Sequence, residues 1–307
     1  MPDLSVVIVS YNTRDLLPRC LAELREAVAG IEHELIVVDN ASTDSSRAYL
    51  RHEAGDIRLI LNERNLGFAT ANNQGLRIAE APIILLLNSD AYITAETVRS
   101  AMRTIHCNPY VGLVGVRILN PDGTVQAESG IFPTLWNDIR VSVGLDQLGR
   151  SSGQAPTIAW PVDWVHGACM FARRVAVQAV GGLDERYFMY SEEIDWCHRF
   201  WKTGWQVWYL PEVTAIHLGG ASSQSNDLSR RVALYRSRLG LRRHLAGPHS
   251  SMLLWFAMIA GLAGRLAVRP ALQVITRRKV GYQSAGADWQ LLLAIARMDP
   301  LARKLAS

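Results

Sequence analysis

Short apolar runs alternate with helical patterns over the first hundred or so residues. The run at residues 4–10 is continuous and rich in Val and Ile, which is typical of a strand buried on both faces. Further strands are expected at 35–39, 57–61, 83–87 and 111–116, and helices at about 14–28, from Ser42 or Thr43, at 68–79 and at 94–106. This succession predicts a parallel α/β sheet with ligand sites beyond the carboxyl ends of its strands.

The pattern changes after residue 116. Residues 117–160 look irregular, with Pro121-Asp122-Gly123 as a hairpin turn and residues 149–153 as a flexible loop. Order is expected to return at 162–173, followed by a helix at about 192–203 and strand-like runs at 206–210 and 213–217. The strand and helix patterns thus continue as far as residue 217.

Composition excludes several classes of protein. Of the 307 residues, 49% are apolar and 20% are charged, which is typical of a globular chain and not of a disordered or collagen-like one. The four cysteines, at positions 20, 107, 169 and 197, share no spacing typical of a disulfide framework or a zinc site, so a reducing compartment fits best. The first residues lack the basic region of a signal peptide, and none is expected.

The net charge of +4 conceals a strong asymmetry. Residues 1–228 hold 18 basic and 26 acidic side chains, a net −8, whereas residues 229–307 hold 14 basic and two acidic ones, a net +12. Such a tail is expected to meet an anionic partner, either nucleic acid or a membrane surface. Its basic residues flank an apolar block and do not line a polar, aromatic groove, so nucleic-acid binding is disfavoured.

The apolar block of the tail is residues 252–264. Thirteen residues span roughly 20 Å as a helix, which is shorter than the ~30 Å hydrocarbon core of a bilayer. The length therefore disfavours a simple transmembrane helix and favours a helix that lies in the membrane plane or is partly embedded, with arginines on both sides. The alternative is a buried helix that packs on the main domain or on a partner subunit.

Candidate chemistry lies at the ends of the predicted strands. The glycine-rich motifs of dinucleotide dehydrogenases and P-loop NTPases are absent, so neither class is expected. Asp90 follows a buried strand, where a carboxylate can hold a divalent cation against phosphate oxygens or can merely cap a turn. Asp39 could hydrogen-bond a base or ribose, or share helix capping with Ser42.

A second acidic group opens the helix expected at 192–203. Glu192, Glu193 and Asp195 could favour the helix dipole and pair with Arg199. One of them could instead be a general base, because crowding of like charges raises the pKa of a carboxyl. His217 follows a strand-like run and could be either structural or a metal ligand.

Taken as an ordered set, these segments resemble the family-2 inverting glycosyltransferases of the GT-A fold. The matching segments are S-V-V-I-V-S-Y-N at 5–12, V-V-D-N-A-S-T-D at 37–44, N-L-G-F at 65–68 with Asn73, N-S-D at 88–90, G-G-L-D-E-R-Y-F at 181–188, and E-E-I-D at 192–195 with Arg199. The resemblance covers about residues 4–245. Within the family, the chain looks most like bacterial rhamnosyltransferases that extend lipid-linked sugars.

The resemblance implies a role for each matching residue. Donor binding falls to Tyr11, Asn12, Asp39, Asn65, Gly67, Asn73, Asn88 and Asp90. Acceptor binding falls to Trp164, His166, Gly167, Glu192 and Asp195, with Arg199 supporting the same helix. Asp90 and His217 are the implied ligands of Mg²⁺ or Mn²⁺, and Glu193 is the implied catalytic base.

Two positions depart from the family pattern. Asn88 replaces the first Asp of the metal-binding D-x-D, which removes one negative charge beside the nucleotide and the metal. Glu193 replaces the Asp of the E-D motif and extends the base by one methylene, so the acceptor would lie correspondingly farther away. Both substitutions keep the chemistry feasible.

The resemblance also implies a reaction and a domain plan. The expected reaction moves a sugar, best matched by dTDP-L-rhamnose as donor, to a hydroxyl of a polyprenyl-diphosphate-linked or cell-envelope glycan. The expected domain is 1–228, with a nucleotide half (1–116) and an acceptor half (117–228), followed by a basic helical region (229–307) on the cytoplasmic face of the bacterial inner membrane. The alternatives are a UDP-hexose or UDP-N-acetylhexosamine donor, or an inactive nucleotide-binding scaffold subunit, and the apolar tail could equally mediate a homodimer.

Overall fold

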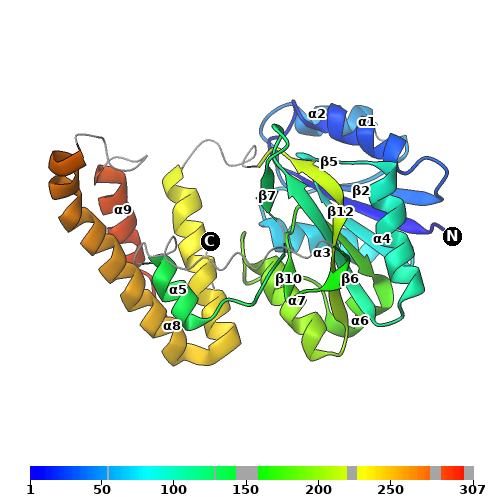
Figure 1. Ribbon diagram of the computed structural model, residues 1–307. Coiled ribbons are helices and arrows are strands. Elements are labelled where there is room, and N and C mark those ends of the chain that lie inside the picture. Colours follow the sequence, from blue (N-terminus) through cyan, green and yellow to red (C-terminus); the bar gives the residue numbers. More distant parts are fainter. Residues whose placement is uncertain (54, 128, 143–157, 220–226, 277–284, 301–307) are drawn as a thin grey trace. The chain divides into compact units, whose positions relative to one another are not determined.

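The computed structural model describes residues 1–53, 55–127, 129–142, 158–219, 227–276 and 285–300 (Figure 1). The chain divides into two compact units. The first unit comprises Met1–Phe132, Gln154–Glu185 and Glu192–Gln224, and the second comprises Pro133–Gly153, Arg186–Ser191 and Ser225–Ser307.

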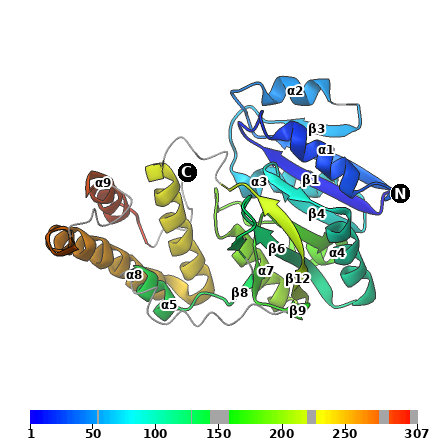
Figure 2. The same cartoon turned by 45° about the horizontal axis from the view of Figure 1, so that its top comes forward.

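A mixed sheet forms the centre of the first unit. Its main path follows the order β3-β2-β1-β4-β11-β6-β12-β5. The strands on this path are β1 (Leu4–Ser10), β2 (His33–Asp39), β3 (Ile57–Leu61), β4 (Ile83–Asn88), β5 (Ala91–Ile93), β6 (Val111–Leu119), β11 (Cys169–Arg173) and β12 (Gln206–His217). The first four are mutually parallel, as expected, and lie in the order β3-β2-β1-β4, of which Figure 2 labels β3, β1 and β4.

The sheet is mostly parallel, as the resemblance implies, but two of the strands on its main path run in the opposite direction. Strand β11 lies between β4 and β6 and is antiparallel to both, and β5 is antiparallel to β12. A continuous apolar run indicates that a strand is buried on both faces but carries no information about its direction. Neither strand follows a helix that would force a parallel crossover: β5 comes two residues after β4, and β11 follows the short strand β10 (Trp164–Val165).

Helices cover both faces of the sheet. The helices of the first unit are α1 (Leu17–Ala27), α2 (Ser46–His52), α3 (Phe68–Ile78), α4 (Ala95–Cys107), α6 (Arg174–Val180) and α7 (Glu192–Lys202). Val6 and Ile8 of β1 contribute to one buried core, with residues of α1 and α4. Val7 contributes to the opposite core, with residues of α3, α6 and α7. Because successive side chains of a strand alternate between faces, both faces of β1 are buried and its sequence is uniformly apolar.

The segment predicted to be irregular contains several short elements. Strand β6 continues to Leu119, and the turn at Pro121-Asp122-Gly123 leads into the antiparallel strand β7 (Val125–Ala127), as the turn residues predict. Gly123 has a φ of 82° and donates its N–H to the carbonyl of Asn120 over 2.9 Å. The other elements are β8 (Ser129–Gly130), α5 (Leu135–Ser142) and β9 (Trp160–Pro161). Two- and three-residue strands are too short for a hydrophobic period, and the loop expected at 149–153 lies outside the described residues.

The second unit is helical in its described part. It contains α5, the long helix α8 (Asp227–Thr276), which is interrupted at Gly247, and α9 (Ala285–Ala296). Gly247 has a φ of 82° and a ψ of 175°, so the helix breaks there. The Trp255 indole then donates to the carbonyl of Ile295 over 2.8 Å, and Arg242, which is 4% exposed, pairs with Asp138 of α5 at 2.5 Å.

The helix of the tail is longer than the apolar block predicted. Among the described residues, one helical stretch, Leu228–Val268, is long and apolar enough to cross a membrane by length and composition alone. Helical residues extend well beyond 252–264 on both sides, so the length of the apolar block alone does not disfavour a spanning helix. The break at Gly247 lies within this stretch.

Candidate active site

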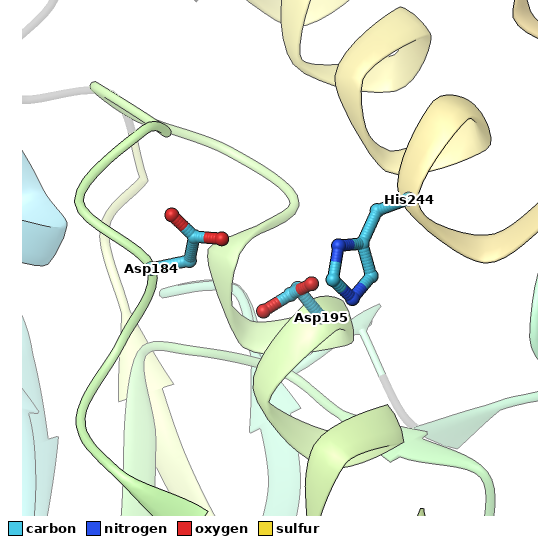
Figure 3. A group of neighbouring side chains, drawn as sticks. All are labelled: Asp184, Asp195 and His244. Carbon is cyan, nitrogen blue, oxygen red and sulfur yellow. The ribbon is translucent and has the colours of Figure 1, made fainter. Parts of the chain in front are cut away.

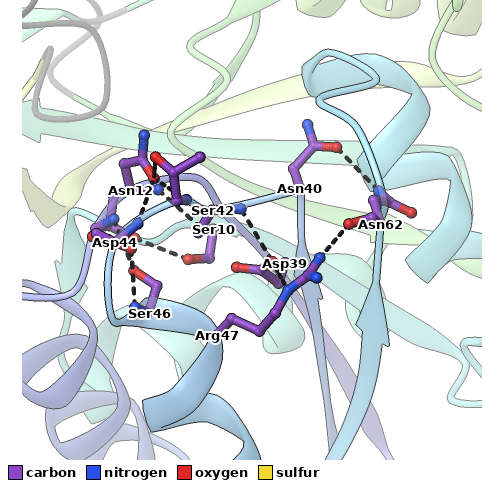
Figure 4. A network of polar contacts seen from close by, with 11 residues as sticks. Ser10, Asn12, Asp39, Asn40, Ser42, Asp44, Ser46, Arg47 and Asn62 are labelled. Atoms are coloured by element: carbon purple, nitrogen blue, oxygen red, sulfur yellow. Dashed lines mark hydrogen bonds and ion pairs between the residues drawn. The ribbon is translucent and has the colours of Figure 1, made fainter.

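The loops after β1 and β2 are tied together by side-chain hydrogen bonds (Figure 4). The two strands end in register, with Ser10 opposite Asp39. The Asn12 Oδ1 atom accepts from the backbone N–H of Thr43 at 2.7 Å, and the Asn12 N–H donates to Ser42 Oγ at 3.0 Å. Asn12 has a φ of 54°, a left-handed conformation that Asn tolerates better than most residues. Asn12 therefore holds the two loops together, and the neighbouring Tyr11 is half-buried.

Asp39, the last residue of β2, is fully buried. Its Oδ1 atom accepts from the Ser42 N–H at 3.2 Å and from Arg47 Nε at 3.1 Å. Arg47 also donates to the carbonyl of Asn62. The other carboxylate oxygen, Oδ2, is buried without a hydrogen-bond partner. A buried unpartnered acceptor is costly, so this atom fits an N–H or O–H group of a ligand.

The sequence did not reveal Arg47 or Asn40 as site residues. The Asn40 Nδ2 group donates to Asn65 Oδ1 at 2.9 Å and to the carbonyl of Gly67 at 3.2 Å, while its Oδ1 accepts from the Leu66 N–H at 3.0 Å. Gly67 has a φ of 84° where α3 begins. Asn40 thus fixes the turn that carries Asn65 and Gly67, and its place directly after Asp39 was the available signal.

The Asn73 side chain makes its hydrogen bonds to the segment just before α7. Its Oδ1 accepts from the Leu183 N–H at 2.9 Å, and its Nδ2 donates to the Leu183 carbonyl at 2.8 Å and to Glu185 Oε1 at 2.9 Å. A Cβ atom on Gly182 would lie only 2.3 Å from Asn73 Oδ1. Asn73, assigned to donor binding from the sequence, therefore spends both ends of its amide in holding the 182–185 segment.

A polar cluster lies where β4 and β12 end. His217 Nε2 lies 3.2 Å from Asp90 Oδ1 and 3.2 Å from Asn88 Nδ2. Asp90 is 7% exposed and His217 is 8% exposed. The Asn88 Oδ1 atom is buried without a partner, and on the far side of the ring His217 Nδ1 lies 2.6 Å from Gln126 Oε1. A carboxylate, an amide oxygen and an imidazole nitrogen are suitable ligands for a divalent cation.

His166 lies against this cluster. Its ring centroid is 5.8 Å from that of His217, and its Nδ1 accepts from the Ala168 N–H at 3.2 Å. Burial, and to a smaller extent the charge on His217, lower the pKa of His166 to about 4. His166 is therefore neutral at physiological pH. Trp164, of the same segment, donates its indole N–H to the Ile131 carbonyl at 2.9 Å.

Helix α7 brings its acidic residues to the same segment. A Cβ atom on Gly167 would lie 3.5 Å from Glu193 Cβ and 4.0 Å from Glu193 Cδ, so the Glu193 side chain lies over Gly167. Glu192 is 5% exposed, and burial together with the charge on Glu193 raises its pKa well above the ordinary value. The Glu192 carboxyl is thus buried and keeps its proton to a higher pH than an ordinary glutamate.

Asp195 is fully buried on α7, and Figure 3 shows it together with Asp184 of the segment before the helix. Asp195 Oδ2 accepts from Arg199 Nε at 2.8 Å. Arg199 also donates to the carbonyls of Val180 at 3.1 Å and Gly182 at 2.7 Å. This carboxylate therefore supports the helix and its neighbouring loop through Arg199.

The predicted site residues thus form three neighbouring groups. The first, at the ends of β1 and β2, holds Asn12, Asp39 and the turn with Asn65 and Gly67. The second, at the ends of β4 and β12, holds Asn88, Asp90 and His217, and His166 lies between it and the third group, Gly167 with Glu193. Asn73 and Asp195 lie apart from these groups, in contacts that support the 180–185 segment.

Comparison with known proteins identifies the family of the chain. The family described as "Glycosyl transferase family 2" matches residues 5–181. A low-salt glycan biosynthesis hexosyltransferase, Agl10 of Haloferax volcanii, is 31% identical over 254 residues, 81% of this chain and 76% of the relative. The N-acetylglucosaminyl-diphospho-decaprenol L-rhamnosyltransferase of Mycobacterium tuberculosis is 30% identical over 294 residues, 88% of this chain and 92% of the relative.

A solved structure shares the fold. The mannosyltransferase PcManGT of Pyrobaculum calidifontis, determined in complex with GDP-Man and Mn²⁺, has a TM-score of 0.57 and is 18% identical. The match covers 96% of this chain and 86% of that one. The likeness confirms the expected GT-A fold, with a mixed sheet and a long apolar helix in the tail.

Glu192→Gln is expected to change how stability depends on pH. The folded protein retains the Glu192 proton above the ordinary pKa of 4.5, whereas the unfolded chain loses it there. Between that pH and the folded pKa, unfolding releases a proton, so stability falls as pH rises, by up to ~1.4 kcal/mol per pH unit. The variant cannot release this proton and should gain stability relative to the wild type as pH rises.

Urea unfolding from pH 5 to 8 measures this difference. Glu212→Gln, at an exposed position of β12, is the matched control and should follow the wild type. Identical pH slopes for the wild type and Glu192→Gln would show that Glu192 is ionised in the folded protein.

Proposed function

The chain belongs to glycosyltransferase family 2 and is a nucleotide-sugar glycosyltransferase, and from this premise we propose roles for its residues, a donor and an acceptor. One observation carries the proposal. The unpartnered Oδ2 atom of Asp39 lies where β1 and β2 end, and the Asp90–His217 pair lies where β4 and β12 end. The base of a nucleoside diphosphate suits the first position, and its phosphates suit the second through a divalent cation.

The base of the nucleotide binds at Asp39. Its Oδ2 accepts an N–H of the base, while Arg47 and the Ser42 N–H hold the other oxygen. Tyr11 and Asn12 bind the nucleotide together with Asp39, and the turn at Asn65 and Gly67, fixed by Asn40, contributes to the same site. Pyrimidine bases such as thymine and uracil present a ring N–H of the kind that Asp39 requires, which supports a dTDP- or UDP-sugar.

A divalent metal, Mg²⁺ or Mn²⁺, is held by Asp90 and His217, and Asn88 lies beside both. The donor set supports this assignment, because Asn88 Oδ1 is a buried oxygen without a partner and His217 Nε2 faces a carboxylate oxygen at 3.2 Å. When bound, such an ion supplies positive charge that stabilises the departing diphosphate. Asn88 contributes no charge where the family has Asp, so we expect weaker metal binding than a second carboxylate would give.

Glu193 is the catalytic base. Its carboxylate accepts the proton of an acceptor hydroxyl as that oxygen attacks the anomeric carbon from the face opposite the diphosphate. The bond to the diphosphate oxygen breaks in the same displacement, so the anomeric configuration inverts. Gly167, against which the Glu193 side chain lies, lines the acceptor side together with Trp164 and His166. The Asp195–Arg199 ion pair supports the helix that carries the base.

The best-supported donor is dTDP-L-rhamnose and the best-supported acceptor is a polyprenyl-diphosphate-linked glycan. The relative from M. tuberculosis is named for rhamnosyl transfer to such a lipid, and it aligns over 88% of this chain. The H. volcanii relative is named a hexosyltransferase, which supports a UDP-hexose as the second candidate. The four cysteines are all free thiols, in keeping with an enzyme of the cytoplasmic side.

The second unit binds an anionic membrane surface, where such an acceptor resides. Leu253 and Phe256 of α8 are 53% and 57% exposed, and Trp289 and Leu293 of α9 are 54% and 40% exposed. Each pair lies three or four residues apart, so it forms one face of its helix. Apolar side chains on the surface, in a region with a net charge of +12, are typical of a peripheral membrane anchor.

Glu193→Gln should nearly abolish transfer and leave donor binding intact. The amide keeps the shape of the carboxylate but cannot accept the proton, and general-base catalysis is typically worth ~10²- to 10⁴-fold. Turnover of dTDP-L-rhamnose and of UDP- and GDP-sugars would be followed by mass spectrometry with a polyprenyl-diphosphate-GlcNAc acceptor, and donor affinity by calorimetry. Glu212→Gln is the matched control, and equal losses of turnover and donor affinity would argue against a base.

Replacement of Phe256 and Trp289 by Ser should weaken binding to anionic vesicles by about tenfold or more. Burial of one large apolar side chain contributes about 1.5–3 kcal/mol, and ~1.4 kcal/mol corresponds to a factor of ten. Co-sedimentation with phosphatidylglycerol vesicles measures the change. Tyr110→Ser, which removes an aromatic ring 66% exposed in the first unit, is the control. Equal sedimentation of the double variant and the wild type would exclude the exposed apolar side chains of α8 and α9 as the anchor.

A further inference from the structure

We propose that Gln126 is a positioning residue that fixes the ring proton of His217 on Nδ1 and so presents Nε2, as a lone pair, to a divalent cation. The inference rests on the proposed function, because it concerns how one of the metal ligands there is oriented. Gln126 lies on β7, 91 residues before His217 in the chain, and no sequence motif marks it.

The orientation of the Gln126 amide is set by three contacts. Its Nε2 group donates to Asn120 Oδ1 at 2.8 Å and to the backbone carbonyl of His217 at 2.9 Å. Both acceptors are oxygens without a proton, so the NH₂ end of the amide must face them. The carbonyl end, Oε1, then faces His217 Nδ1 at 2.6 Å.

The amide orientation determines the tautomer of the imidazole. An amide oxygen accepts hydrogen bonds and cannot donate, so His217 Nδ1 must carry a proton to make this contact. A neutral imidazole has one ring proton, which leaves Nε2 with a lone pair. Metal-binding histidines are commonly oriented in this way, by a hydrogen bond from the nitrogen that does not bind the metal.

The contacts at Nε2 point to a cation. This atom lies 3.2 Å from Asp90 Oδ1, and in the Nδ1–H tautomer no proton lies between the two electron-rich atoms. The Asn88 Nδ2 group, also at 3.2 Å, donates to the lone pair in the absence of metal. A divalent cation would bind the lone pair and the carboxylate together.

The backbone holds Gln126 in place. The turn at 121–123 connects β6 to β7, and Asn120 is tied across it to Thr124, with a side-chain bond of 3.0 Å. On the other side, a Cβ atom on Gly219 would lie 3.0 Å from Gln126 Nε2, and Gly219 has a φ of +68°. The amide therefore has little freedom to turn.

The tautomer can be measured directly on the full-length wild-type protein without metal. Nitrogen-15 NMR distinguishes the two ring nitrogens, and the His217 signals are assigned by their loss in His217→Gln. The expected result is a proton on Nδ1 and an unprotonated Nε2. A neutral ring with its proton on Nε2, donated to Asp90, would overturn the proposal without any variant of Gln126.

Mn²⁺ affinity, measured by electron paramagnetic resonance, tests the consequence. Gln126→Leu should bind Mn²⁺ about 10- to 100-fold more weakly, the usual cost of losing such a supporting hydrogen bond. Gln126→Glu should lose less affinity than Gln126→Leu, because its carboxylate still accepts from Nδ1 although it no longer donates to Asn120 and to the His217 carbonyl. Val125→Ala, at the adjacent exposed position of β7, is the control and should match the wild type.

Three results of the Mn²⁺ measurements would overturn the proposal. Unchanged Mn²⁺ affinity in Gln126→Leu, or equal losses in the Leu and Glu variants, would reduce Gln126 to a structural tie between β7 and β12. Wild-type protein that transfers sugar but binds no Mn²⁺ would overturn this inference and leave the glycosyltransferase assignment standing, so the two failures can be told apart.

Discussion

The parallel register of β1 with its two neighbours is the constraint on which the site depends. Ser10 lies opposite Asp39, and Val9 lies opposite Asn88, so three strands end at one edge of the sheet. Beyond that edge the backbone makes no further hydrogen bonds within the sheet. Its N–H and C=O groups therefore need partners from loops, from side chains or from a ligand. The burial of β1 on both faces, in two separate cores, holds this edge in place.

Most of the polar atoms at that edge find partners within the protein. Asn12, Asn40 and Arg47 use their side chains to fold the loops after β1, β2 and β3, and Gln126 does the same for the end of β12. Two buried oxygens, Asp39 Oδ2 and Asn88 Oδ1, are left without one. They belong to the two groups where a nucleotide base and a metal-bound diphosphate would bind, so these two unmet hydrogen-bonding atoms lie where a ligand would supply partners.

The sequence predicted the helices and strands that show a regular pattern of apolar side chains. The first four strands and their helices follow from apolar periodicity, and Asp39 and Asp90 are marked as candidates by their places after strands. Glu193 was singled out from its acidic neighbours only by the family resemblance. The direction of β11, the short strands between 119 and 165 and the full length of α8 could not be predicted, because they depend on contacts distant in the chain or on too few residues. Arg47 and Gln126 were missed for the same reason, since their partners are Asp39 and His217, which only the fold brings to them.

The central claim is that Glu193 drives a single displacement at the anomeric carbon. The most direct measurement is the anomeric configuration of the product, determined by the one-bond carbon–hydrogen coupling at that carbon in NMR. The account predicts the configuration opposite to that of the sugar in the donor. A product that retains the donor configuration would contradict it, because retention requires two displacements or attack from the face of the leaving group.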